Sequence, residues 1–475
     1  MADFNILSSI LSADQVIRKD QKGYEEAINI GNLMYRYTTP AAVVKVKSVN
    51  DVRSTIAFAR KNHLRVTVKN GGHSYMGYCL NEGGIVLDLS LMNTCHIDYD
   101  KMLIHMDAGL VWKDVYDKYL QDKRNIVIGG QCPWVGVSGF TLGAGLSPFS
   151  RSYGLGCDNL LEMTIVAWDG NIITVSREDK DLEKRELFWA LAGGGGGNFG
   201  VTVSMTSRMH KLRDEDGHVV CGQLVWHLPQ QKEDFENMMN VFNTTKCPDE
   251  LTIDALWSHN KNKQLTGGMT VIYNGAEGQA REALKNLLAF NPSVVDLEEM
   301  EWTNWVEQKA EGWDPKSEVF HHHASFIFAE GAITPELTAT ISRIVEEATK
   351  VCQAELLPHA IGQKAAYINY IDRNVEDWQQ AYYGDNYRRL QEIKTKWDPH
   401  NVFWNWQSIE LIKDGKTVPH PGSVKKMENW WMQYAPLVDP EHLHWPETEQ
   451  EVYERDAKLR KVICDKVQPN GIATA

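Results

Sequence analysis

One short stretch, Lys69 to Tyr75, combines two adjacent glycines with a histidine in the order Lys-Asn-Gly-Gly-His-Ser-Tyr. Alternating apolar and polar residues from Leu64 to Val68 predict a strand that leads into it. Glycines permit a positive φ and a close approach to a ligand, and inward-pointing backbone N–H groups can hold phosphate oxygens. His73 would then offer a nucleophilic ring nitrogen to whatever this turn binds. A hairpin turn with an exposed histidine is the alternative, and these residues alone leave it open.

A second unusual stretch, residues 129–145, holds six glycines in seventeen residues together with Cys132. This glycine density argues against both a helix and a central strand, so we predict a long irregular loop. The apolar residues Val135 and Phe140 argue against disorder. We therefore expect the loop to wrap against a flat ligand that its glycines allow to come close.

A third glycine run, Gly193 to Gly200, contains a formal Gly-x-Gly-x-x-Gly pattern at Gly195, Gly197 and Gly200. A dinucleotide-binding site of the Rossmann type requires a strand before the glycines and a helix after them. Here the predicted order is helix, glycines, strand. The sequence therefore disfavours a Rossmann site.

Composition narrows the class of protein. The chain has 475 residues, with 43% hydrophobic and 24% charged residues, which predicts a globular protein of two or three domains. A net charge of −14 argues against binding to nucleic acid or to anionic lipid. We find neither a signal-peptide pattern nor an apolar run of the ~18 residues that a membrane helix needs, so we expect an intracellular, cytoplasmic protein. The eight cysteines include no Cys-x-x-Cys pair, which argues against structural zinc.

The first 210 residues read as elements that deliver the glycine loops. Residues 1–35 look helical and peripheral, and a strand at 41–46 followed by a helix at 48–62 predicts a small β-α-β unit whose second strand ends at Lys69. Further expected strands are 84–89, two short ones around 98–107, 161–167, 171–176 and 201–206, and further expected helices are 112–119 and 182–190.

From about residue 211 the pattern changes to an alternation of strands and amphipathic helices. The expected helices are 232–245, 278–290 and 335–350, and the expected strands are 251–257, 268–273, 320–328 and 354–361. This pattern predicts a separate α+β domain with an antiparallel sheet covered by helices on one face. A His run at 321–323 permits a metal site, but only two of its side chains would share a face of a strand, which favours a sheet face that lines a cavity.

The C-terminal part continues with a strand at 365–372, on which Tyr367, Asn369 and Ile371 would face one way and Tyr370 the other. A helix at 386–397 should end before Pro399, since proline cannot continue it. Residues 413–475 are polar and include a charged amphipathic helix at 447–467, which we expect to pack on another part of the protein or on a second subunit.

Four separated stretches together resemble one family. They are the Gly-Gly-His-Ser at 71–74, the segment 130–136 around Cys132, the segment 196–202, and the segment 386–409. In this order they resemble the vanillyl-alcohol-oxidase-type flavoproteins, and within them the berberine-bridge-enzyme-like oxidases. The likeness runs from about residue 38 to residue 411.

The resemblance implies an α+β fold with a split FAD-binding domain of the PCMH type and an α+β substrate domain. The implied division is an N-terminal helical segment 1–35, the FAD-binding domain 36–210, the substrate domain 211–362, a returning C-terminal segment 363–412 and an extension 413–475. It implies FAD attached twice, through His73 to the flavin 8α-methyl and through Cys132 to flavin C6. The other implied cofactor-binding residues are Lys69, Asn70, Gly71, Gly72, Ser74, Tyr75, Val135, Gly136, Ser138, Gly139, Gly143, Gly145, Asn198, Gly200, Val201 and Asn405.

The resemblance also implies the chemistry. Tyr370, with Tyr367 beside it in the Tyr-x-Asn-Tyr element, would be the catalytic base; a free tyrosine has pKa ~10 and needs an environment that lowers this value. A strand tyrosine packed in the core is the alternative for both. Val135 occupies the position that gates oxygen in the family, and valine there favours an oxidase. We thus expect an FAD-dependent oxidase that takes a hydride from an alcohol, amine or sugar-like small molecule and gives H2O2 from O2.

An alternative is a flavoprotein that catalyses an oxidative or non-redox cyclisation in a biosynthetic pathway. In either case we expect no metal and no nucleic-acid or membrane partner, and a monomer or a homodimer.

Overall fold

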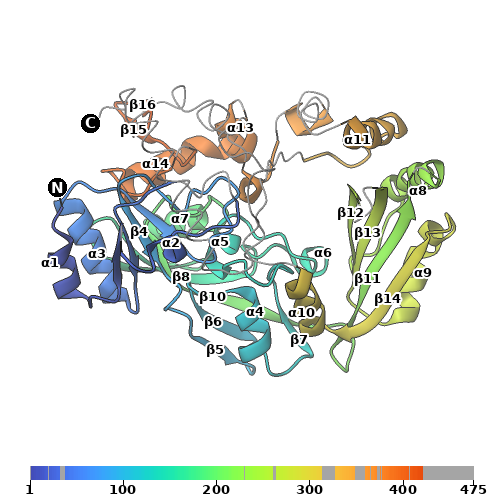
Figure 1. The fold of residues 1–475 in the computed structure, drawn as a ribbon, viewed down its shortest axis with the longest axis horizontal. Coiled ribbons are helices and arrows are strands. Elements are labelled where there is room, and N and C mark those ends of the chain that lie inside the picture. The colour runs from blue at the N-terminus through green and yellow to red at the C-terminus, as the bar shows by residue number, and fades with distance from the viewer. Residues whose placement is uncertain are drawn as a thin grey trace.

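The computed structural model describes most of the chain (Figure 1). The described residues are 2–19, 21–32, 38–228, 230–259, 264–312, 327–347, 359–363, 365–371, 375, 377–405 and 407–420. Within them, no helix has the length and apolar character that a membrane crossing requires. Residues 320–326 and 354–358 of two expected strands lie outside the described residues, and 327–328 and 359–361, which are described, form no strand. The His run at 321–323 and the helix 447–467 lie wholly outside the described residues.

The first sheet carries the His73 loop and has four strands in the order β1-β2-β4-β3. Their bounds are Val16–Arg18 for β1, Ala42–Lys45 for β2, Val66–Lys69 for β3 and Ile85–Asp88 for β4. β2 and β3 both run parallel to β4, and helix α3 (Val49–Lys61) connects them. The Ser48 side chain caps α3 by accepting from the amide of Asp51. The β-α-β unit is confirmed, with β4 inserted between its two strands.

The N-terminal segment is more than a peripheral helical arm, and the prediction for 1–35 was wrong in this respect. It does contain helices α1 (Phe4–Ile10) and α2 (Tyr24–Ala27), but β1 pairs antiparallel with β2 and extends the sheet. Ile28 and Ile30 are buried in the core beneath the glycine loop. The three residues of β1 are too few to show a periodic signal, so pairing rather than local pattern defines this strand.

The second sheet is antiparallel, in the order β5-β6-β10-β8-β9, and β7 also pairs with the long strand β10. The bounds are Cys95–Asp98 for β5, Leu103–Asp107 for β6, Asn125–Val127 for β7, Leu160–Val166 for β8, Ile172–Ser176 for β9 and Val201–Lys211 for β10. Its helices are α4 (Trp112–Asp114), continued by a π-helical turn (Val115–Tyr119), α6 (Ser150–Tyr153) and α7 (Leu182–Leu191). Trp112, Tyr116, Leu160, Met163 and Met205 belong to one core cluster.

The glycine-rich stretch 129–145 is not wholly irregular, which corrects the prediction that it contains no helix. Residues Val137–Leu142 form the short helix α5, and most of its side chains are buried. Only Gly139 lies inside the helix, because Gly136 and Gly143 stand at its two ends as caps. Glycine is well tolerated at helix termini, so the density of glycine over the whole stretch concealed one turn and a half of helix.

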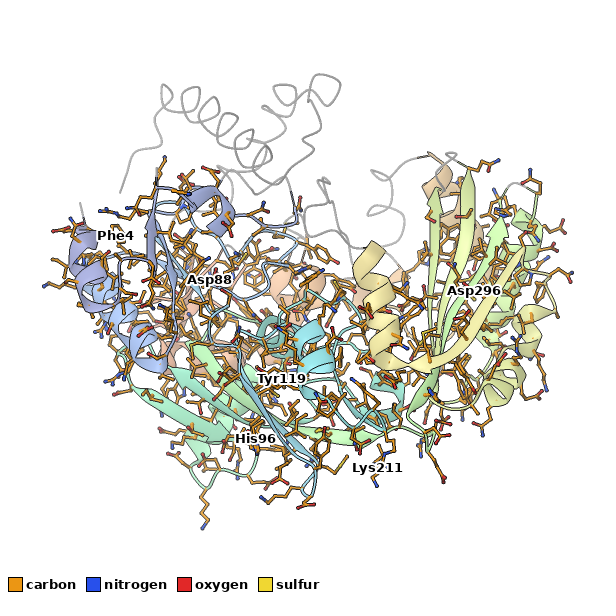
Figure 2. All side chains as sticks on the ribbon, turned by 60° about the horizontal axis from the view of Figure 1, so that its bottom comes forward. Phe4, Asp88, His96, Tyr119, Lys211 and Asp296 are labelled. Carbon is orange, nitrogen blue, oxygen red and sulfur yellow. The ribbon has the colours of Figure 1, made fainter. Side chains whose placement is uncertain are left out.

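The third sheet stands to one side of the molecule (Figures 1 and 2) and is antiparallel, in the order β12-β13-β11-β14. The bounds are His218–His227 for β11, Leu251–His259 for β12, Leu265–Tyr273 for β13 and Val294–Glu301 for β14. Helices α8 (Lys232–Thr244) and α9 (Glu277–Leu288) cover one face and share its hydrophobic core. Helix α10 (Trp302–Gly312) follows β14 and contacts α4, while α11 (Pro335–Glu347) contacts α8 and β12. The predicted α+β architecture with a helix-covered antiparallel sheet is confirmed.

The C-terminal segment returns to the first two sheets. Helix α13 (Trp378–Tyr383) precedes α14 (Tyr387–Trp397), and a hairpin of β15 (Leu411–Lys413) and β16 (Lys416–Val418) follows. α14 packs against α7, and Phe403 forms an isolated parallel bridge with Val66 of β3. Segments about two hundred residues apart or more are thus adjacent in space.

The expected strand at 365–372 was wrong. Residues 368–370 form a 3-10 turn in which the amide of Tyr370 donates to the carbonyl of Tyr367 over 2.9 Å. The Asn369 amide group donates to the carbonyl of Phe140 and to the hydroxyl of Tyr367. The ring of Tyr370 packs on the ring of Tyr367 at 5.1 Å instead of facing the opposite way. A β-rich composition forms a strand only where a neighbouring strand pairs with it, and these hydrogen bonds bind the segment to α5 instead.

Candidate active site

A cavity of about 740 Å³ lies where the glycine loops, the third sheet and the C-terminal segment meet. The loop after β3, the loop before α5 and the Gly195–Gly197 turn line it from the side of the first two sheets. Thr252 and Asp254 of β12 line it from the third sheet. Residues from 367–371 and 404–408 complete the wall. The three stretches selected from the sequence as chemically unusual therefore share one cavity.

The His73 loop and the Cys132 loop interlock through backbone contact. A Cβ built on Gly71 would overlap the carbonyl oxygen of Trp134 and lie 2.7 Å from the amide nitrogen of Gly136. Asn70 joins the same contact, since its Oδ1 accepts from Ser138 Oγ at 3.1 Å. Gly71 and Gly136 are thus required by close approach of two chains, and the contact fixes the spacing between the two loops.

His73 is half-buried, and the loss of solvent around its ring lowers its pKa to about 4. A histidine in this state is a neutral imidazole at neutral pH, with a ring nitrogen able to act as a nucleophile. Burial acts in the opposite sense on Cys132 and raises the pKa of its thiol to about 11, although the backbone N–H groups of Trp134 and Val135 oppose this shift. The protein alone therefore prepares the imidazole for reaction and holds the sulfur as a thiol.

Three tyrosines gather at the same wall. Tyr370 lies between Tyr75 and Tyr367, with ring centroids 5.5 Å and 5.1 Å away respectively. The hydroxyl of Tyr367 accepts from the amide of Leu146 at 3.0 Å, whereas the Tyr370 side chain is 45% exposed and lines the cavity. Burial, and then the neighbouring Tyr75 and Tyr367, raise the pKa of Tyr370 above its ordinary value. This shift is opposite to the one a tyrosine base requires, so these residues favour Tyr370 as a hydrogen-bond donor.

Most of the residues predicted to bind the cofactor line the cavity. They are Asn70, Gly71, Gly72, His73, Ser74, Tyr75, Cys132, Val135, Gly136, Ser138, Gly139, Asn198, Gly200 and Asn405, together with Tyr367 and Tyr370.

Four of the predicted cofactor-binding residues do not line the cavity: Lys69, Gly143, Gly145 and Val201. The ammonium of Lys69 faces away, donating to the carbonyl of Ala27 at 3.1 Å and lying 3.6 Å from Asp88. Gly143 packs against the side chain of Asn369, Gly145 against Phe140, and Val201 is buried in the core.

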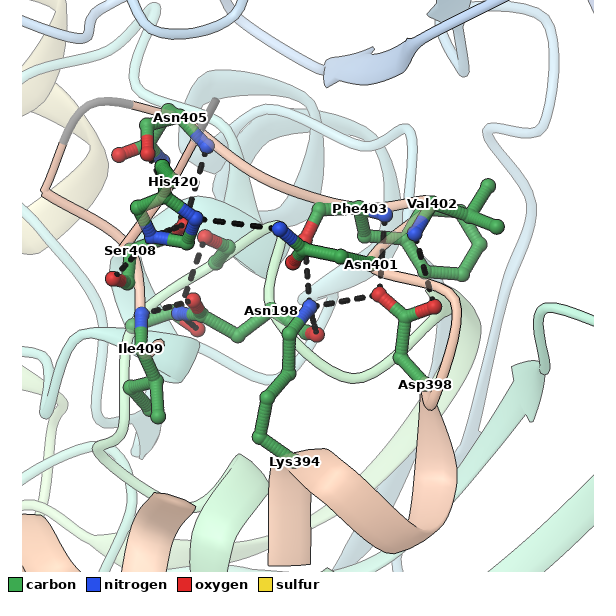
Figure 3. A network of polar contacts seen from close by, with 12 residues as sticks. Asn198, Lys394, Asp398, Asn401, Val402, Phe403, Asn405, Ser408, Ile409 and His420 are labelled. Atoms are coloured by element: carbon green, nitrogen blue, oxygen red, sulfur yellow. Dashed lines mark hydrogen bonds and ion pairs between the residues drawn. The ribbon is translucent and has the colours of Figure 1, made fainter. Parts of the chain in front are cut away.

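A fully buried lysine joins the C-terminal segment to the third glycine run (Figure 3). Lys394 donates to the carbonyl of Asn198 at 2.6 Å, to the carboxylate of Asp398 at 2.6 Å and to the carbonyl of Phe403 at 2.5 Å. The Asn198 side chain donates to the carbonyls of two glycines of the turn and accepts from the amide of Ile409 at 3.0 Å. Lys394 and Asn198 thus fix the Gly195 turn against the segment that carries Asn405.

Sequence reasoning missed the polar residues that the third sheet and its helix bring to the cavity. Asp254 of β12 and Lys309 of α10 both line it, as does Arg151 of α6. The alternation along β12 was visible as a strand, but nothing in it indicates which face is covered by helices and which is open. Only the sheet order and the position of α8 and α9 settle that point.

Comparison with known proteins gives a consistent result. Residues 40–176 match a family described as FAD binding domain, and residues 366–410 match one described as berberine and berberine like. An uncharacterized FAD-linked oxidoreductase of Bacillus subtilis is 26% identical over 456 residues, covering 84% of this chain and 97% of that protein. The chain thus combines an FAD binding domain with a berberine-like segment, and over most of its length it is similar to FAD-linked oxidoreductases. The fold agrees: the Physcomitrella patens BBE-like 1 structure superposes with a TM-score of 0.71 at 21% identity, covering 86% of this chain and all of that one.

Two further relatives of this oxidoreductase have activities in their names. The (R)-6-hydroxynicotine oxidase of Paenarthrobacter nicotinovorans is 34% identical over 214 residues, or 45% of this chain and 44% of that enzyme. Phl p 4, a grass pollen allergen with glucose dehydrogenase activity, superposes with a TM-score of 0.72 at 19% identity, covering 86% of this chain and all of that one.

The cavity residues fit the FAD of this family of oxidoreductases. Thr202 is 4% exposed and lines the cavity, and its hydroxyl oxygen has no hydrogen-bond partner within the described part of the chain. Buried hydroxyls in native proteins are hydrogen-bonded, so this oxygen indicates a polar group of a ligand. The loops at 70–75 and 130–139 and the Gly195–Gly197 turn would hold the cofactor, which supplies a two-electron acceptor when bound.

Proposed function

We propose that the protein is an FAD-dependent oxidase whose flavin is attached through both His73 and Cys132. It takes a hydride from an alcohol, amine or sugar-like substrate and transfers the electrons to O2, which gives H2O2. The observation that carries this proposal is the backbone contact of Gly71 with Trp134 and Gly136, because it holds the loop of His73 and the loop of Cys132 against one cavity. Two such anchors would fix a flat ring while one face stays open to the third sheet.

The proposed roles follow from the state of each side chain. His73, neutral because burial lowers its pKa, is the nucleophile that forms the first bond. Tyr370 touches the reacting hydroxyl or amine and orients it as a hydrogen-bond donor. Val135 lines the cavity next to the Cys132 loop, where a small side chain would leave O2 a path to the cofactor.

We propose a functional division that follows the sequence boundaries with one amendment. Residues 36–210 and 363–412 bind FAD together, and residues 211–362 form the wall that faces the substrate. Strand β1 gives the segment 1–35 a place in the FAD-binding part, since it pairs with β2. The names of the relatives support amines and sugars as the first substrate classes to test.

The experiment is anaerobic mixing of the purified protein with primary and secondary alcohols, glucose and 6-hydroxynicotine, followed by admission of air. We expect at least one class to bleach the flavin, and air to restore the colour with one H2O2 formed per flavin reoxidised. Tyr370→Phe should slow the bleaching by about tenfold or more while retaining flavin, because one oriented hydrogen bond to the reacting group is lost. Tyr119→Phe, a change to a partly exposed tyrosine on the π-helical turn, is the matched control. A flavin that no compound bleaches contradicts the proposal.

A further inference from the structure

Asp254 reaches the cavity from β12 and is held by a residue of the Cys132 loop. Its Oδ2 accepts from Nε2 of Gln131 at 3.0 Å. Gln131 is held in turn by α10, since its Oε1 accepts from the indole N–H of Trp305 at 3.4 Å. The hydrogen bond therefore crosses the boundary between the third sheet and the loop that precedes α5, and it fixes the carboxylate next to Cys132.

The carboxylate keeps capacity for another hydrogen bond. Asp254 is the one Asp or Glu among the described residues that line the cavity, and the bond from Gln131 engages only one of its oxygens. Lys309 lines the same cavity and favours the ionised carboxylate through space, but its ammonium lies 4.3 Å from the ring centroid of Trp305. A carboxylate oxygen open to a cavity is able to accept a proton from a bound molecule.

The position of Asp254 relative to the proposed flavin indicates what its carboxylate oxygen does. If the flavin is attached at Cys132 as proposed, the edge of the ring next to that bond would be the edge that accepts the hydride. Gln131 is the residue before Cys132, so the Gln131–Asp254 hydrogen bond brings the carboxylate to the same edge. A substrate carbon placed for hydride transfer there would have its hydroxyl or amine within reach of Asp254.

We propose that Asp254 is the proton acceptor of the oxidation, and this inference rests on the proposed function. The carboxylate of Asp254 takes the proton of the breaking O–H or N–H bond of the substrate, while the electron pair of the breaking C–H bond would be accepted, as hydride, by the bound flavin. A C=O or C=N bond forms, and the carboxylic acid later returns the proton to water. Gln131 is a positioning residue, since it acts only through Asp254.

The pKa shifts support this assignment over a tyrosine base. Burial raises the pKa of Asp254 above its ordinary value, against the opposing effects of Gln131 and Lys309. A base is most effective when its pKa approaches the working pH, so the shift improves Asp254 and weakens Tyr370. The groups that interact with Asp254 are Lys309, whose pKa is lowered by burial, and Tyr370, whose raised pKa keeps it neutral; the Cys132 thiol and the Arg151 guanidinium line the same cavity.

Asp254→Asn is the main test, because asparagine still accepts from Gln131 but takes up no proton. We expect flavin content and attachment to be unchanged, and kcat/KM for the fastest compound of the panel to fall ~10²- to 10⁴-fold. In the wild type kcat/KM should decline tenfold per pH unit below the pKa of Asp254, and the variant should lose this decline. Asp296→Asn, at an exposed position of β14 on the opposite edge of the sheet (Figure 2), is the control and should keep both the wild-type rate and its decline with pH.

A second measurement needs no substrate. Ionisation of a carboxylate beside the ring edge perturbs flavin absorption, so a pH titration of the resting protein should show one step that Asp254→Asn removes. Gln131→Ala should move this step to higher pH, since the Gln131 hydrogen bond lowers the pKa of Asp254. Retained flavin with an unchanged step and an unchanged rate in Asp254→Asn overturns this inference and leaves the oxidase proposal intact. A protein without flavin contradicts both.

Discussion

Two pairs of lysine and aspartate differ in whether the carboxylate keeps an oxygen that can accept a further hydrogen bond. Lys394 and Asp398 have fully buried side chains 2.6 Å apart, the lysine donating three hydrogen bonds and both carboxylate oxygens accepting. Asp254 accepts one hydrogen bond in the cavity, and Lys309 lies over an aromatic ring instead of on the carboxylate. The first pair has no capacity left for a ligand, so it is structural. The second keeps a free acceptor, so it is the one suited to chemistry.

The largest expected effect is on the structural pair. Lys394→Met should reduce the free energy of unfolding by about 3–5 kcal/mol, because it leaves the Asp398 charge buried without a counter-charge and removes the donor of the Asn198 and Phe403 carbonyls. Urea unfolding of the flavin-loaded protein measures this. Adding Asp398→Asn should recover part of the loss, since it removes the uncompensated charge. A loss below about 1 kcal/mol for Lys394→Met would show that the pair does not hold the C-terminal segment.

The second largest effect is expected at the contact between the His73 loop and the Cys132 loop. Gly71→Ala should cost about 1–3 kcal/mol, because the added methyl overlaps the backbone of Trp134 and Gly136 and separates the two loops. We also expect a lower fraction of flavin attached at Cys132, measured by peptide mass. Gly278→Ala in α9, which does not line the cavity, is the matched control, since a Cβ there meets nothing within 4 Å, and it should be neutral or slightly stabilising. Equal attachment in both variants would contradict the role given to the contact.

A smaller effect on stability is expected at the chemical pair. Asp254→Asn should change the free energy of unfolding by less than about 0.5–1 kcal/mol even though it lowers the rate, because its side chain faces a cavity and still accepts from Gln131. Urea unfolding in parallel with Lys394→Met makes the contrast direct. If the two variants destabilise equally, the distinction between a structural and a chemical pair fails.

The smallest effect belongs to an exposed ion pair. Arg389 of α14 makes two hydrogen bonds of 2.7 Å to Glu186 of α7, and both side chains are almost half exposed. Glu186→Gln should cost about 0.2–1 kcal/mol, and less at high salt, because solvent screens the pair. Thermal unfolding at low and high salt tests this. A cost that is large and independent of salt would place this pair with Lys394 instead.

The sequence predicts the parts of this site whose signal is local. Adjacent glycines mark Gly71, the cysteine marks the second loop, and a capping Ser48 marks the start of α3. It fails where partners decide the structure. Strand β1 exists because it pairs with β2, and Tyr370 lies in a 3-10 turn because Asn369 bonds to α5 instead of to a strand.

The role of Asp254 in the third sheet could not be predicted from the sequence, because it too depends on contacts with distant residues. Asp254 is one polar residue in an alternating strand, and only the arrangement of β12 against the Cys132 loop brings it to Gln131. Lys394 reads as an ordinary charged residue of an amphipathic helix, and its burial depends on carbonyls of Asn198 and Phe403 that lie far away or beyond the helix end. Local pattern gives the elements, and long-range contact gives these residues their roles.

The most direct test of the account is the mass of the peptides that contain His73 and Cys132, taken from protein precipitated with acid and digested. We expect the yellow colour to stay with the precipitate and one flavin to join both peptides, so that neither appears at its unmodified mass. Colour released entirely into the supernatant, with both peptides at their unmodified masses, would contradict it.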